Sequence, residues 1–78
     1  MVMRFITNQN GSRIINLEHI VQIVVGESGK SINVEDRNGN MEEIAWYSDR
    51  NRCRKAMLEI TKLLMSGCTM IIPDKGDE

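Results

Sequence analysis

Residues 31–47, SINVEDRNGNMEEIAWY, place the dipeptide Asn38-Gly39 between two segments in which apolar and polar side chains alternate. Alternation of this kind is typical of a half-buried strand, and Asn-Gly between two such segments is the strongest short-range signal of a β-hairpin. We expect a type I′ turn, in which both central residues have positive φ. A second dipeptide, Asn10-Gly11, predicts a second hairpin of the same kind.

The remaining strands follow from β-branched and apolar runs on either side of these turns. We expect strands at residues 2–7, 12–16, 20–25, 31–35 and 41–47. Residues 20–25 are almost entirely apolar, which favours a central strand covered on both faces. In the last strand we expect Ile44 and Trp46 to face the core, and Glu43, Ala45 and Tyr47 to face the other side.

A single helix is predicted after the last strand. Ser48 or Asp49 can cap its amino end, and Gly67 suits a left-handed carboxyl cap. Between them, apolar residues recur at three- and four-residue steps, at Cys53, Ala56, Met57, Ile60, Leu63 and Leu64. The predicted fold class is therefore α+β: an antiparallel β-meander of four to five strands, packed on one face by a single C-terminal helix.

Two apolar features have no place in this core. Leu58 and Met65 form a second apolar seam on the helix, and Met70-Ile71-Ile72 precede Pro73. Either the C-terminal segment packs within the chain, along the helix or as a short extra strand at a sheet edge, or these residues contact a second chain. We expect one domain over residues 1–78, with residues 73–78 forming a frayed tail.

Size and composition favour self-association. A domain of 78 residues buries only about 60–65% of the surface of its unfolded chain, so a homodimer would add stability. There is no apolar run near the ~18 residues of a membrane span and no leader-like segment, so we expect a cytoplasmic protein with no membrane contact. Two cysteines in no metal-like spacing are expected to be reduced thiols.

Charge is unevenly distributed although the net charge is −1. Residues 35–49 carry five acids and one base, a net −4, and residues 50–62 carry five bases and one acid, a net +4. The acids of the hairpin are Glu35, Asp36, Glu42 and Glu43, and the bases at the helix start are Arg50, Arg52, Arg54 and Lys55. These surfaces are either solvated faces or sites for a charged partner.

Motifs for chemistry are incomplete. Gly29-Lys30-Ser31 resembles the end of a phosphate-binding loop, but Val24 stands where a glycine is needed and a strand follows instead of a helix. The oxygens of residues 36–42 lack the spacing of a calcium loop. With His19 the single histidine, and Cys53 assigned to the core, we expect no catalytic residue, cofactor or metal, and no enzyme.

The order of turns, apolar positions and terminal helix over residues 3–64 resembles the flagellar FlbD family of small bacterial proteins and its uncharacterised relatives. The residues that carry the likeness are Asn10-Gly11, Ile15-Asn16-Leu17, Ile20, Ile23, Ile32, Val34, Asn38-Gly39 and Ile44. The resemblance implies a small regulatory or adaptor role in a bacterium or its phage.

We therefore predict a non-catalytic protein-interaction or regulatory module that binds a protein partner and forms a homodimer. The candidate partner-binding residues are Leu58, Met65, Arg54, Arg50, Glu42 and Glu43. One alternative is nucleic-acid binding through Arg50, Arg52 and Arg54, with Trp46 and Tyr47 available for stacking. The other is a small phage-type inhibitor that blocks a bacterial enzyme with its acidic hairpin.

Overall fold

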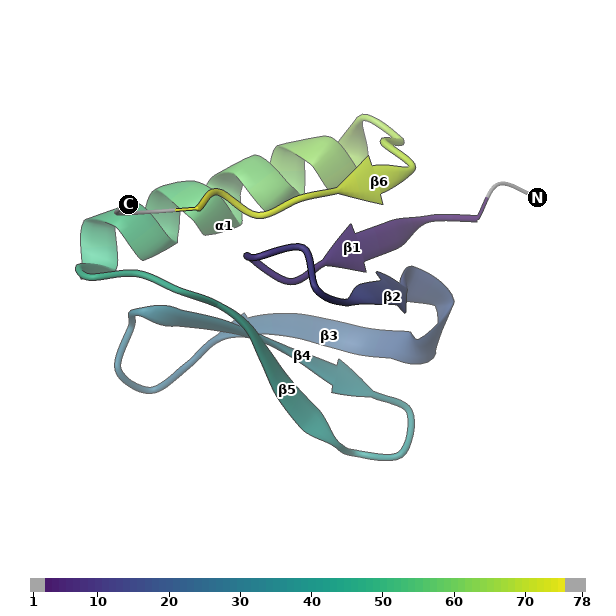
Figure 1. Cartoon of the computed structure of the whole chain (residues 1–78), viewed down its shortest axis with the longest axis horizontal. Coiled ribbons are helices and arrows are strands. Elements are labelled where there is room, and N and C mark those ends of the chain that lie inside the picture. The colour runs from purple at the N-terminus through teal and green to yellow at the C-terminus, as the bar shows by residue number, and fades with distance from the viewer. Residues whose placement is uncertain (1–2, 76–78) are drawn as a thin grey trace.

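The computed structural model describes residues 3–75 and has the expected α+β architecture (Figure 1). Within these residues, five strands and one short 3₁₀ helix precede a single α-helix, and a sixth strand follows it. In chain order the elements are β1 (Phe5–Thr7), β2 (Ile14–Asn16), η1 (Leu17–His19), β3 (Ile20–Val25), β4 (Ser31–Asp36), β5 (Met41–Trp46), α1 (Arg50–Met65) and β6 (Met70–Ile71).

The strands form two sheets of three strands. In one, β3, β4 and β5 are antiparallel in that order, and in the other β1 pairs with β2 on one side and with β6 on the other. The prediction of a central strand at residues 20–25 is wrong, because β3 lies at an edge and β4 is in the middle. β4 pairs with both of its sequence neighbours, β3 and β5, and therefore lies in the middle. The strand before β3 in the chain, β2, belongs to the other sheet, so β3 has no second neighbour.

Both Asn-Gly turns are present, but neither is of type I′. Gly11 and Gly39 have φ of 76° and 85°, and no other residue type between 3 and 75 has a positive φ. In the second turn the Gly39 amide donates to the Asp36 carbonyl at 3.0 Å, as in a type I turn closed by a left-handed glycine. The Asp36 carboxylate accepts from the amides of Asn38 and Asn40, which stabilises this form and, chiefly through Asn40, lowers the pKa of Asp36.

A β-bulge in β5 changes which of its side chains face the core. Ile32 of β4 is opposite Ala45, but the next residue, Asn33, is opposite Glu43, so Ile44 is an extra residue. Ile44, Ala45 and Tyr47 are all buried, and Trp46 is 54% exposed. The prediction of Ile44 in the core is confirmed, and those for Trp46, Ala45 and Tyr47 are wrong, because one inserted residue reverses the alternation beyond it.

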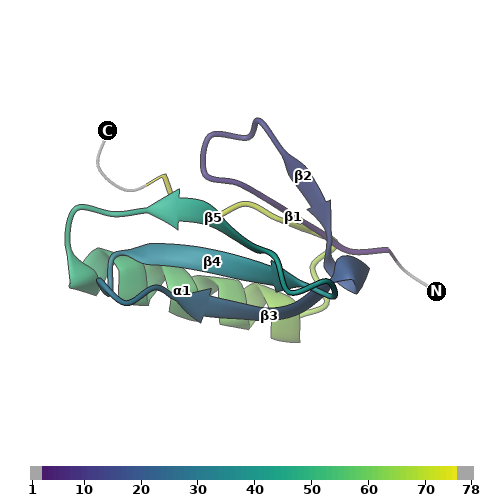
Figure 2. The same cartoon turned by 90° about the horizontal axis from the view of Figure 1, so that it is seen from below.

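Helix α1 covers one face of the β3-β4-β5 sheet, which lies in front of it in Figure 2. Asp49 is the N-cap and accepts from the Arg52 amide at 2.8 Å. At the other end Gly67 has φ of 81°, and the amides of Gly67 and Cys68 donate to the carbonyls of Leu64 and Leu63. The buried core consists of Ile6, Ile32, Val34, Ile44, Ala45, Tyr47, Cys53, Ala56, Ile60 and Ile71.

The C-terminal segment packs within the chain. β6 pairs in parallel with β1, Ile71 is fully buried, and Pro73 is buried as well. The Tyr47 hydroxyl donates to the Asp74 carbonyl at 2.5 Å. The segment expected to fray from residue 73 is therefore held in place as far as Lys75, and the rest of that expected tail, like Val2 at the start of the first strand, lies outside the described residues.

Candidate functional site

A groove of about 440 Å³ runs between the edge strand β3 and the helix α1. Its walls are mainly apolar, with Ile23 contributed by β3 and Met57 and Leu64 contributed by α1. The residues that line it are Arg4, Leu17, Ile20, Val21, Gln22, Ile23, Met57, Ile60, Thr61 and Leu64. Concave apolar surfaces of this kind are typical of sites that receive side chains of another molecule.

The outer edge of β3 is free within residues 3–75, since β3 pairs with β4 alone. The Gly26 amide donates to the Ser31 carbonyl, so these residues form a hydrogen-bonded pair next to the loop. Bonded and non-bonded pairs alternate along an antiparallel ladder. Val25 and Ile23, opposite Ile32 and Val34, are therefore non-bonded positions whose amide and carbonyl groups point away from β4, toward the free edge.

The helix seam predicted from the sequence continues this groove. Leu58 is 56% exposed and Met65 is 84% exposed. They lie three residues before and four residues after Thr61, a groove residue, so all three share one face of α1. Val21, at the β3 edge, is 59% exposed. We call the groove, the β3 edge, Leu58 and Met65 together the α1–β3 side.

The arginines at the helix start do not form one basic surface. Arg50 donates from Nε to the Ser28 carbonyl at 3.1 Å, and its side chain packs over Gly29. Arg52 lies 3.6 Å from a carboxylate oxygen of Asp49. Arg54 is exposed on the helix, on the same flank as Leu58. The structure thus ties two of the three arginines to the loop and the cap beside them.

The acids of the β4-β5 hairpin are also divided between different contacts. Glu42 pairs with Arg13 of β2 at 3.2 Å, and Glu35 accepts a hydrogen bond from Gln22 of β3. Asp36 is engaged in the turn, and Glu43 lines a different pocket on the other side of β5. The acidic residues predicted as a binding surface therefore do not converge on one point.

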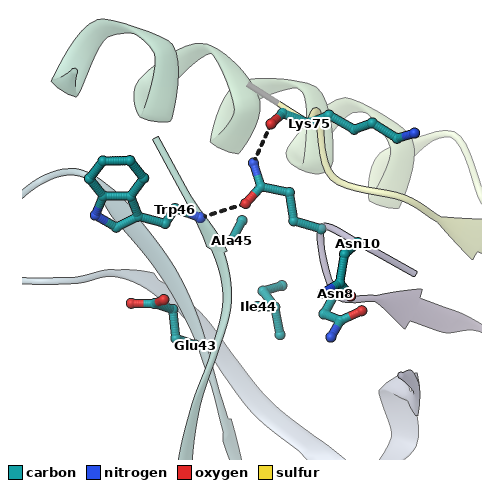
Figure 3. Close-up of a pocket in the computed structure, with 8 residues that line it drawn as sticks. Asn8, Asn10, Glu43, Ile44, Ala45, Trp46 and Lys75 are labelled. Carbon is teal, nitrogen blue, oxygen red and sulfur yellow. Dashed lines mark hydrogen bonds between the residues drawn. The ribbon is translucent and has the colours of Figure 1, made fainter. Parts of the chain in front are cut away.

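Sequence reasoning missed Gln9, which joins the first hairpin to β5. In Figure 3 the two dashed lines lead to its side chain from the Trp46 amide and the Lys75 carbonyl. Its amide donates to the Ile44 carbonyl at 2.7 Å, and its side-chain oxygen accepts from the Trp46 amide at 2.8 Å. Its side-chain NH₂ donates to the Lys75 carbonyl at 2.8 Å. These bonds satisfy edge groups of β5 and form the back of an open pocket of about 450 Å³ beside Trp46. A lone glutamine in a turn gives no sequence signal of this role.

Groups capable of nucleophilic chemistry are separated. Cys53 is fully buried, and burial raises the pKa of its thiol, which disfavours the reactive thiolate. The Cys68 thiol donates to the Met70 carbonyl at 3.1 Å, and neither cysteine is in a disulfide. His19 is exposed at the end of η1. Within residues 3–75 no three His, Cys, Asp or Glu side chains are grouped as metal ligands would be.

Comparison of the chain with protein-family models, curated proteins and solved structures gave no match. The resemblance to the FlbD family therefore stays a prediction from the residues. In the part of the chain that the structure describes, no helix is long and apolar enough to cross a membrane.

Proposed function

We propose that this protein is a non-catalytic protein-interaction module, a small adaptor or regulator of a bacterium or phage, and that it binds its partner through the α1–β3 side. The observation that supports this most is the free β3 edge beside an apolar groove. A strand edge offers unpaired backbone groups, and a neighbouring groove accepts side chains, which is the combination used in binding by strand addition.

The α1–β3 side exposes large apolar side chains to solvent. Val21, Leu58 and Met65 are each more than half exposed on this side. Exposed apolar side chains gathered on one side of a small domain are costly in water and typically mark an interaction site. The free thiols Cys53 and Cys68 are consistent with a reducing compartment, so we also propose a cytoplasmic location.

Nucleic-acid binding through the helix start has weaker support. Arg50 and Arg52 contact Ser28 and Asp49, and binding a phosphate would require breaking these contacts. The enzyme-inhibitor alternative is weakened in the same way, because Glu42 is paired with Arg13. A nucleic-acid function would still show itself as oligonucleotide binding that weakens steeply with salt, since phosphate contacts release counterions.

The proposal predicts that a charge at Leu58, on the helix flank of the α1–β3 side, abolishes partner binding. Leu58→Lys places an ammonium group in the apolar patch, and Ile72→Lys is the matched control, since Ile72 is equally exposed, at 59%, in the segment beyond β6. Affinity capture from a lysate, read by mass spectrometry, should recover the same partners with wild type and Ile72→Lys and lose them with Leu58→Lys. Retention of every partner by Leu58→Lys would contradict the proposal.

A further inference from the structure

The β3 edge is complementary to itself. In its regular segment the outward-facing backbone groups belong to Ile23 and Val25, which lie symmetrically about Val24. An antiparallel copy placed on a two-fold axis at Val24 sets Ile23 opposite Val25 of the partner copy, and Val25 opposite Ile23 of the partner copy. Each of these pairs can exchange two N–H···O=C bonds, which satisfies all four outward-facing groups of each chain.

The side chains agree with this register. Ile23 faces the helix side of the sheet, because it lines the groove together with Met57 and Ile60 of α1. Val25, two residues further along the strand, faces the same side. Residues opposite each other in an antiparallel pair point to the same face, so the proposed pairing places apolar groups against apolar groups on that face. On the other face Val24 meets Val24 of the partner copy.

The edge also lacks most features that prevent strand pairing. β3 contains no charged residue and no proline, the two commonest means by which proteins block an edge. Its ladder is irregular between Ile20 and Gln22, but the segment from Ile23 to Val25 that the pairing uses is regular. Because nothing in the sequence of this edge blocks pairing, the molecule that binds here is expected to pair with it as another strand.

Helix α1 runs alongside the same strand edge. Ser28, just beyond β3, contacts Arg50 at the start of α1, and Ile20, at the other end of β3, lines the groove together with Leu64. Val24 is therefore level with the middle of α1, where Leu58 is exposed. A two-fold axis at Val24 places the two α1 helices, each with an exposed Leu58, on the same face of the joined sheet.

We infer that the occupant of the α1–β3 side is a second copy of this chain, bound by antiparallel pairing of the two β3 edges about a two-fold axis at Val24. This inference rests on the proposed function and names its partner. The β3 edge is only about 20 Å long, from six strand residues at about 3.3 Å each, so the contact is smaller than a standard interface and belongs with weak, transient ones. We therefore expect dissociation constants on the order of 10–100 µM.

Charge exchange at Val24 tests the pairing. Directly opposed like charges destabilise a strand pair, and opposite charges support it. Sedimentation equilibrium should show wild type moving from 8.9 kDa toward twice that mass as concentration rises. Val24→Lys and Val24→Glu alone should each stay monomeric, with dissociation constants raised about tenfold or more, and their equimolar mixture should dimerise. The control Ile14→Lys, at an exposed β2 position, should dimerise like wild type.

Circular dichroism and thermal melting test whether each variant is folded. Formation of a dimer in the equimolar mixture would show independently that both Val24 variants are folded. A dimer that persists in both single variants, or a mixture that stays monomeric, would overturn pairing at Val24. Wild type that remains monomeric at millimolar concentration would overturn the second copy as occupant. In that case the Leu58→Lys capture experiment still decides the proposed function, because it does not depend on self-association.

Discussion

Arg4 connects the first strand to the carboxyl end of the helix. Its guanidinium donates to the carbonyls of Leu64 at 2.7 Å, Cys68 at 3.0 Å and Leu63 at 3.4 Å. A cation at this end also interacts favourably with the helix dipole. A single side chain thus satisfies carbonyl groups that the helix leaves open and holds two ends of the fold together.

We predict that Arg4→Met lowers the free energy of unfolding by about 2 kcal/mol, since hydrogen bonds from a charged donor contribute about 1.5–3 kcal/mol. Arg13→Met is the control: its pair with Glu42 is solvent-exposed, and exposed pairs contribute about 1 kcal/mol or less. Urea unfolding followed by circular dichroism measures both. Equal losses in the two variants would show that Arg4 does not cap the helix.

Tyr47 makes stability depend on alkaline pH. Burial of the phenol, with smaller effects of Asp74 and Cys53, raises the pKa of Tyr47 to about 12. The unfolded chain releases this proton near pH 10, and the folded protein keeps it until about pH 12. The stabilising contribution is therefore complete below pH 10 and is lost as pH rises from 10 to 12.

The expected loss is at most about 1.4 kcal/mol per pH unit in that window. Tyr47→Phe removes the titrating group, while the Asp74 carbonyl keeps its hydrogen bond from Gln9. Urea unfolding between pH 9 and pH 11.5 should show a steeper decline in wild type than in Tyr47→Phe. Parallel curves would mean that Tyr47 does not carry the effect.

At the level of elements, the bulge in β5 decides which residues form the core. Asn33 is opposite Glu43 and Ile32 is opposite Ala45, so Ile44 and Ala45 are both buried and Trp46 turns outward. The alternation of apolar and polar residues shows which side chains share a face of the strand. A bulge reverses the faces beyond it, and the sequence does not show where the bulge occurs. This is why the strand was predictable and the burial of its second half was not.

We predict that Trp46→Ala lowers the free energy of unfolding by about 1 kcal/mol or less, because the indole is half exposed, and that Ile44→Ala lowers it by about 2–4 kcal/mol. Thermal or urea unfolding of the two variants gives the comparison. A larger loss for Trp46→Ala would place the indole in the core and remove the bulge from the explanation.

At the level of the whole molecule, the local signals were predictable and the long-range contacts were not. Gly11, Gly39 and Gly67 were found because each adopts a positive φ at a chain reversal. The parallel pairing of β6 with β1 joins the two ends of the chain, and the edge position of β3 depends on where the first hairpin goes. The exposed seam at Leu58 and Met65 was predictable from helical periodicity, and its continuation into the β3 groove required the fold.

The pairing of two copies of the chain through their free β3 edges can be measured directly. Amide hydrogen exchange by NMR, recorded from about 10 µM to about 1 mM, tests it at individual residues, because these concentrations span the expected dissociation constants. We predict that exchange at the Ile23 and Val25 amides slows as concentration rises, while exchange at exposed amides of the first hairpin stays constant. Exchange at Ile23 and Val25 that is fast and the same at every concentration would contradict the account.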